Sequence, residues 1–161
     1  MHSLKSPDFS WPVRVYWEDT DAGGIVFYAN YLKFFERART EWLRSLGLVQ
    51  STLKANTGGM FVVADTSVRY LRPARLDDEL LVTAQLQDKG RASLIIMQTA
   101  LLKSEQKSLP STLPSTFPST FPTTVLAQGT IRIGWVNAAT LQPARIPSAV
   151  LDRLVTLNQH T

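Results

Sequence analysis

One long amphipathic helix pattern, followed by several consecutive strand patterns, places the strongest limit on the fold. Between residues 31 and 46, apolar and aromatic side chains recur at the spacing of one helix face. With Asn30 as N-cap and Gly47 as the stop, the helix is predicted to have about 16 residues and a length of roughly 24 Å. Strand patterns lie at 12–17, 60–71, 79–88, 91–104 and 125–137, and a short final helix is predicted over 147–159. We therefore predict an α+β fold in which a curved, antiparallel, five-stranded sheet wraps around one long central helix.

Length and composition predict a single domain over residues 1–161. A chain of 161 residues with 44% hydrophobic content can bury one core. No apolar run approaches the roughly 18 residues of a membrane span, and the first residues lack the apolar stretch of a signal peptide, so we expect a cytoplasmic protein. The absence of cysteine excludes disulfides, thiolate zinc sites and cysteine nucleophiles.

The segment at about 108–124 is a proline repeat, with Pro110, Pro114, Pro118 and Pro122 at every fourth position. This spacing is incompatible with a helix or a central strand, so we predict a Pro/Ser/Thr-rich loop inserted between two strands. A docking segment for a proline-binding module is the less favoured interpretation.

The positions of the two histidines limit the kinds of catalytic site that the chain can form. His2 and His160 lie within two residues of a terminus, where chains are usually frayed, so a Ser-His-Asp triad and histidine-based zinc sites are excluded. An enzyme built on this chain would need a carboxylate, or less plausibly lysine or tyrosine, as base or nucleophile, and we expect no cofactor and no metal. The net charge of +4 is scattered along the chain, which favours an anionic small molecule over nucleic acid.

An acidic turn precedes the long helix and carries the best candidate carboxylates. Asp19, Asp21 and Gly24 match positions 1, 3 and 6 of a calcium loop, but Gly23 and Asn30 stand at positions 5 and 12, where ligands are required. Two interpretations remain. The acids cap and solubilise the turn, or one of them faces a carbonyl polarised by the helix-terminal N–H groups.

The stretch VYWEDTDAGGIVFYANYLKFFERARTEWLRSLGL, residues 15–48, closely resembles the signature of the 4-hydroxybenzoyl-CoA thioesterase family of hot-dog-fold proteins, especially its YbgC-type (Tol-Pal-associated) acyl-CoA thioesterases. The stretch VRYLRPARLDDELLVTAQL, residues 68–86, is similar to the strand-turn-strand pattern of the same family. The resemblance implies a hot-dog fold, a homo-oligomer (dimer or homotetramer) with active sites at the subunit interface, and hydrolysis of an acyl-CoA without a cofactor.

The resemblance also implies roles for individual residues. The family's catalytic aspartate falls on Asp21, and the amide that polarises the thioester carbonyl falls on Tyr28, whose side chain is assigned an orienting role only. Trp17 and Gly24 are expected beside the substrate, and Arg91 falls where the family carries basic residues that meet the phosphates of CoA. Asp21 would either attack the thioester carbonyl or deprotonate a water, and both remain open.

Three further points define the expected function. Glu36 and Arg39 lie outside the apolar stripe of the helix, and we interpret Glu36 as helix surface or as an ion-pair partner at a subunit contact. YbgC-type proteins commonly carry histidine where this chain has Tyr28 and tyrosine where it has Trp17, so the substrate is a short-chain acyl-CoA or an aroyl-CoA. The alternative is a catalytically silent hot-dog protein that binds an acyl thioester or an envelope-system partner, while a dehydratase is disfavoured because such enzymes use a histidine.

Overall fold

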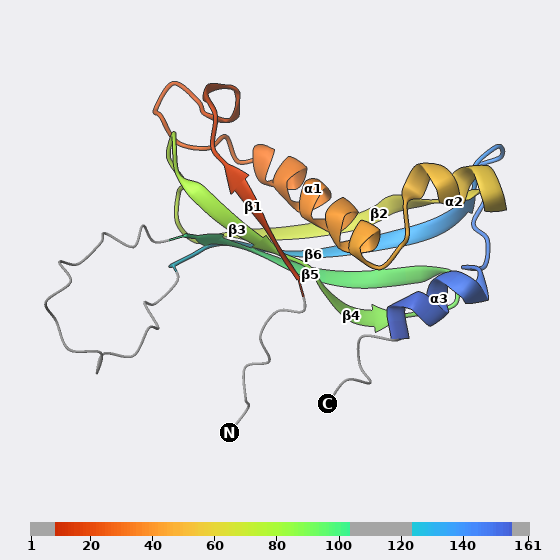
Figure 1. The fold of residues 1–161 in the computed structure, drawn as a ribbon. Coiled ribbons are helices and arrows are strands. Elements are labelled where there is room, and N and C mark those ends of the chain that lie inside the picture. The colour runs from red at the N-terminus through yellow and green to blue at the C-terminus, as the bar shows by residue number, and fades with distance from the viewer. Residues whose placement is uncertain (1–8, 104–123, 156–161) are drawn as a thin grey trace, which may run out of the picture.

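The computed structural model describes residues 9–103 and 124–155, which form one sheet and three α-helices (Figure 1). The sheet is antiparallel throughout and has the strand order β1-β3-β5-β6-β2, with β4 also paired to β5. In chain order the elements are β1 Ser10–Arg14, the short 3-10 helix η1 Trp17–Asp19, α1 Asn30–Ser45, α2 Gln50–Thr57, β2 Gly59–Tyr70, β3 Glu79–Thr83, β4 Gln85–Lys89, β5 Ser93–Leu102, β6 Thr124–Asn137 and α3 Ser148–Val155.

The predicted α+β class is confirmed, with two corrections to the strands. The strand expected over 79–88 is broken at Ala84 into β3 and β4, so the sheet has six strands and not five. The first strand ends at Arg14, and Trp17 belongs to η1 and not to the strand expected over 12–17. At both places the backbone leaves the regular strand pairing that an alternating sequence pattern predicts.

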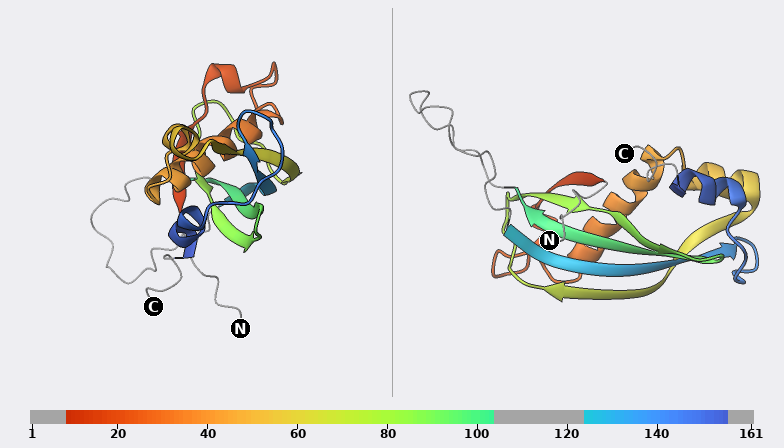
Figure 2. Two further views of the ribbon diagram at one scale, coloured as in Figure 1. Left: turned by 90° about the vertical axis from the view of Figure 1, so that its right-hand side faces the viewer. Right: turned by 90° about the horizontal axis from the view of Figure 1, so that it is seen from below.

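Helix α1 lies across the inner face of the curved sheet and supplies the centre of the core (Figure 2). Phe34 and Phe35 are fully buried, and burial of each such side chain contributes about 1.5–3 kcal/mol. Gly129 on β6 allows this packing, because an added Cβ there would come within 2.9 Å of the Phe35 ring. The helix is thus held over the middle of the sheet, and its N-terminal end projects toward the acidic turn.

The start of α1 differs from the prediction in its cap. Ala29 is the N-cap and offers no side-chain hydrogen bond, whereas Asn30 is the first helical residue. The Asn30 side chain is buried and its Nδ2 donates to the main-chain carbonyl of Asp19 at 2.8 Å. Asn30 therefore ties the helix to the acidic turn and does not cap the helix itself.

The end of α1 confirms Gly47 as the stop. Gly47 has a φ of +79°, its N–H donates to the Arg44 carbonyl at 2.9 Å, and the Leu48 N–H donates to the Leu43 carbonyl at 2.9 Å. These two bonds form a Schellman motif, in which a left-handed glycine satisfies the last carbonyls of a helix.

Helix α2 was not predicted from the sequence, since none of its residues is buried and it has no apolar stripe. The predicted proline repeat falls almost entirely in residues 104–123, outside the described residues. The flanking strands are described, and Leu102 at the end of β5 pairs with Thr124 at the start of β6. Within the described ranges, no helix is long and apolar enough to cross a membrane.

Candidate active site

The acidic turn is a tight hairpin that presents the side chain of Asp21. The Asp21 N–H donates to the Ile25 carbonyl at 2.9 Å, and the Gly24 N–H returns to the Asp21 carbonyl at 3.0 Å. The Gly23 N–H donates to Asp21 Oδ1 at 2.8 Å. Gly24 has a φ of +76°, a backbone conformation that favours glycine, and an added Cβ there would meet nothing within 4 Å. Gly24 is therefore required by the backbone conformation of the turn.

The two aspartates of the turn have opposite environments. Asp19 is only 4% exposed, and its Oδ2 accepts a hydrogen bond from the Tyr16 N–H at 2.8 Å. Its main-chain carbonyl accepts from Phe27 N–H at 2.9 Å, in addition to the bond from Asn30. Asp21 is exposed, and its Oδ2 has no hydrogen-bond donor in the described part of the chain. Asp19 therefore holds the turn together, while Asp21 offers a carboxylate oxygen to a ligand.

The backbone just before α1 has an unpaired donor. Among residues 9–103 and 124–155, no group accepts a hydrogen bond from the N–H of Tyr28. The Tyr28 carbonyl, in contrast, accepts from the Tyr70 hydroxyl at 2.9 Å, and the Tyr28 side chain is 63% exposed. This N–H lies at the positive end of the α1 dipole, so it is suited to an acceptor that gains negative charge.

A largely apolar cavity of about 260 Å³ adjoins this donor, between the start of α1 and the end of β2. Three tyrosine rings line it, and Tyr70 packs edge-on against Tyr28 and Tyr31 with centroids 6.1 and 5.5 Å apart. Burial raises the pKa of Tyr31 and of Tyr70 above the ordinary value, so both hydroxyls stay neutral at physiological pH. The other lining residues are Ile25, Val26, Leu71, Arg72 and Pro73.

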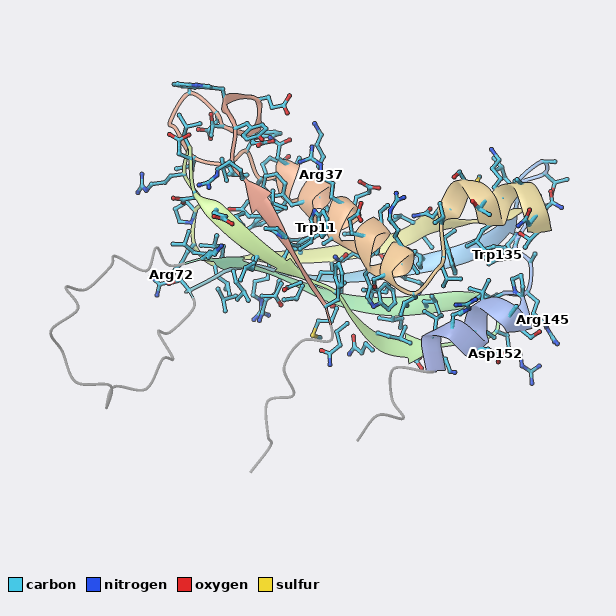
Figure 3. The ribbon with its side chains drawn as sticks, viewed as in Figure 1. Trp11, Arg37, Arg72, Trp135, Arg145 and Asp152 are labelled. Atoms are coloured by element: carbon cyan, nitrogen blue, oxygen red, sulfur yellow. The ribbon has the colours of Figure 1, made fainter. Side chains whose placement is uncertain are left out.

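Of the predicted site residues, Tyr28 lines this cavity, whereas Asp21 and Gly24 lie on the turn that precedes it and are not part of the lining. Trp17 is 81% exposed on η1, on the same acidic loop as Asp21 but outside the cavity lining. Arg91 lies in the turn between β4 and β5, where its carbonyl accepts from the Ile146 N–H at 2.8 Å. Figure 3 shows the distance between Arg91 and the cavity indirectly. Arg145, the neighbour of Ile146, lies beside α3, whereas Arg72, which lines the cavity, lies at the opposite end of the sheet. On β5, Ser93 near Arg91 and Ala100, which is level with Tyr70 across β6, are seven residues apart, or roughly 23 Å.

Glu36 occupies the helix surface, as expected, where its Oε1 accepts from the Thr40 hydroxyl at 2.9 Å. It lies eight residues beyond Tyr28, roughly 12 Å along the helix axis, so it cannot share the Tyr28 donor. Within the described residues, no three His, Cys, Asp or Glu side chains are grouped closely enough to hold a metal ion.

Sequence reasoning missed Tyr70 as a residue of the cavity. Its only sequence signal is its position at the end of a strand pattern, which does not indicate that its hydroxyl reaches the chain before α1. Tyr31 was predicted as part of the apolar stripe, and it is buried, yet its hydroxyl also accepts from the Ala74 N–H at 3.1 Å.

Comparison with known proteins identifies the family. The sequence profile of the Thioesterase-like superfamily matches residues 15–154. The Acyl-CoA thioester hydrolase YbgC of Escherichia coli O157:H7 is 49% identical over 89% of this chain and 92% of its own length. The Acyl-CoA thioesterase YbgC of Haemophilus influenzae is 37% identical over 88% of this chain and 90% of its own length. The crystal structure of a probable thioesterase from Bartonella henselae covers 86% of this chain and 98% of its own, with a TM-score of 0.68 and 27% identity.

The chain therefore belongs to the thioesterase-like superfamily and to its YbgC-type branch, and its fold is the hot-dog fold.

Proposed function

We propose that this member of the YbgC-type branch is a thioester hydrolase that converts an acyl-CoA into a free acid and CoA, with Asp21 as the reacting carboxylate. Two observations carry the proposal: the acidic turn presents a free Asp21 Oδ2, and the N–H of Tyr28, just before α1, is unpaired among the described residues. The names of the relatives support the same activity.

Hydrolysis of a thioester requires a hydrogen-bond donor for the carbonyl oxygen and a carboxylate that acts on the carbonyl carbon, directly or through water. The Tyr28 N–H donates to the thioester carbonyl oxygen, which becomes negatively charged in the transition state, and one such donor contributes about 2.7–4 kcal/mol. Asp21 then either attacks the carbonyl carbon, which forms a mixed anhydride and releases the CoA thiolate, or accepts a proton from an attacking water. In the first route water cleaves the anhydride and regenerates the Asp21 carboxylate. Both routes give the same products.

The acyl group occupies the cavity lined by Tyr28, Tyr31 and Tyr70. Aromatic rings in offset or edge-on contact stabilise a further ring by about 0.5–1.5 kcal/mol beyond its buried area, which supports an aroyl group as well as a short acyl chain. A thiol-release assay over a panel of short-chain acyl-CoA and aroyl-CoA esters identifies the preferred class.

The position of Arg91 supports an active site shared between subunits. In one chain Arg91 is at the far end of the sheet from Asp21, so a coenzyme held by both residues needs a second copy. Strand β2 offers a place for that contact, because it is an edge strand of 12 residues at the end of the strand order. The proposed assembly is a cytoplasmic homo-oligomer, a dimer or tetramer, in which Arg91 meets the phosphates of CoA and Trp17 and Gly24 border the substrate.

The decisive experiment is Asp21→Asn. Asparagine retains the shape and the turn-forming oxygen but removes the negative charge, so kcat should fall by at least roughly 10² to 10⁴ with KM and the oligomeric state retained. A kcat within about threefold of wild type would remove Asp21 from the mechanism. If the wild-type chain releases no thiol from any ester yet binds acyl-CoA, the silent binding protein is the correct alternative.

A further inference from the structure

Arg39 places a cation in the contact between α1 and the sheet, with no carboxylate of the described residues within salt-bridge distance. The residue is only 9% exposed, although we expected it outside the apolar stripe of the helix. Within residues 9–103 and 124–155, no carboxylate oxygen lies within 4.0 Å of its nitrogens. Burial lowers the pKa of Arg39, because desolvation disfavours the charged form, and the negative charge of Glu36 only partly opposes this shift. A buried charge of this kind ordinarily requires a counter-charge or a full set of hydrogen bonds.

Gln98 on β5 fixes the orientation of Arg39. Gln98 is fully buried, and its Nε2 donates to the carbonyls of Phe35 at 2.9 Å and Thr83 at 3.3 Å. Its Oε1 must therefore face the other way, where it accepts from Arg39 Nη1 at 2.9 Å. This network uses only one edge of the guanidinium. The Nε and Nη2 atoms, which form the opposite fork, have no acceptor among the described residues.

Arg39 lines a cavity of about 150 Å³ between α1, the start of α2 and the first half of β2. Its apolar walls are Leu43, Phe61, Val62, Val63 and Ile133, and its polar members besides Arg39 are Glu36, Thr40 and Gln50. The volume is well below the roughly 300 Å³ of sites for larger ligands, so the occupant must be small.

We propose that this cavity binds a small monocarboxylate, whose two oxygens accept hydrogen bonds from Arg39 Nε and Nη2 and whose short apolar tail contacts Val62, Val63 and Ile133. A planar carboxylate matches the two parallel N–H groups of a guanidinium fork, which makes such pairs strong and directional. The apolar walls select against inorganic anions, which have no tail to bury. The site is separate from the Tyr28 cavity, because Arg39 lies 11 residues further along α1, roughly 16 Å.

The carboxylate of Glu36 competes with a bound carboxylate for the Arg39 guanidinium. It lies three residues before Arg39 on α1, within reach of the same helix face, but its Oε1 is engaged by the Thr40 hydroxyl at 2.9 Å. A bound carboxylate would sit near this negative charge. The affinity of the ligand must therefore rise when the charge of Glu36 is removed.

The test is a titration of the full chain with sodium butyrate, against sodium chloride at equal ionic strength, followed by methyl NMR. Saturable shifts are expected at the methyl groups of Val62, Val63 and Ile133. Shifts confined to Ile25 and Val26 would place the carboxylate in the tyrosine-lined cavity and overturn the proposal, as would the absence of any carboxylate-specific shift.

Variants then test the role of the charge. Arg39→Met should weaken butyrate binding at Val62 and Val63 by at least about tenfold, whereas the control Arg37→Met, on the exposed side of the same helix, should change it by less than about twofold. Equal affinity in Arg39→Met and wild type overturns the proposal. If Arg39→Met does not fold, Glu36→Gln decides, because it should tighten binding by at least about threefold. Unchanged or weaker binding in Glu36→Gln contradicts a carboxylate on the Arg39 fork.

Discussion

Replacement of Asp19 by alanine separates the two acids of the turn. The substitution removes one hydrogen bond, the 2.8 Å contact in which Asp19 Oδ2 accepts from the Tyr16 N–H. The bonds from Phe27 and Asn30 remain, because they end on the main-chain carbonyl of residue 19. Asp19→Ala is therefore a local change that leaves the connection between the turn and α1 in place.

The loss in stability follows from that single bond. A hydrogen bond to a charged acceptor contributes about 1.5–3 kcal/mol, and the Tyr16 N–H lies in a partly buried position where water replaces the carboxylate incompletely. For a chain of this size, each kcal/mol lowers the melting temperature by about 2–4 °C. We expect Asp19→Ala to lower the melting temperature by about 3–12 °C, while kcat per folded molecule stays within about threefold of wild type.

Differential scanning calorimetry and the thiol-release assay measure the two quantities on the same preparations. Asp21→Asn serves as the matched control, since it should keep the melting temperature within about 2 °C of wild type and lose kcat. The opposite result, in which Asp19→Ala keeps its melting temperature and loses kcat by about 10² or more, would show that Asp19 is the reacting acid and that its burial in the turn is relieved when substrate binds.

Two further predictions concern segments remote from the turn. Removal of residues 109–123, with a short glycine-containing turn in their place, should leave the melting temperature and kcat nearly unchanged, because Leu102 and Thr124 already pair across β5 and β6; a variant that fails to fold would show that the repeat packs on the domain. Arg91→Ala should raise KM for CoA esters and weaken the dependence of KM on salt, with little change in kcat. The control Arg44→Ala, which changes an exposed arginine paired with Glu41, should leave KM and kcat unchanged. Equal KM values in the two variants would show that Arg91 is an ordinary solvated residue of its turn.

The sequence predicts those helices and strands whose signals lie within their own residues. The aromatic stripe of α1 and the glycine that ends it are local signals, and both appear in the structure. Helix α2 was not predicted because it lacks such a signal: its eight residues bury no side chain and have no apolar period. The break at Ala84 has no local signal either, since it arises where Ala84 donates to the carbonyl of Phe9, far away in the sequence.

The candidate site shows the same division. Residue types and spacing could assign an acidic turn before a helix, but only the family resemblance ranked Asp21 above Asp19, which lies two residues away and has the same side chain. In a regular strand they would point to the same face. The 3-10 turn over Trp17–Asp19 instead directs Asp19 back onto the Tyr16 N–H, and the hairpin closed by Gly24 turns Asp21 outward.

Arg39 extends this argument to the interior of the helix. The charge of Arg39 predicts a solvated side chain like that of Arg37, yet Arg39 lies four residues after Phe35 and therefore on the buried face of α1. What draws Arg39 inward is a single acceptor on a different element, the Oε1 of Gln98, whose direction is fixed by two main-chain carbonyls. A buried charge held by one hydrogen bond, with the Nε and Nη2 donors unused, is the feature on which the proposed carboxylate site rests. The Glu36→Gln titration measures whether the partner of these donors is a carboxylate that enters from solution.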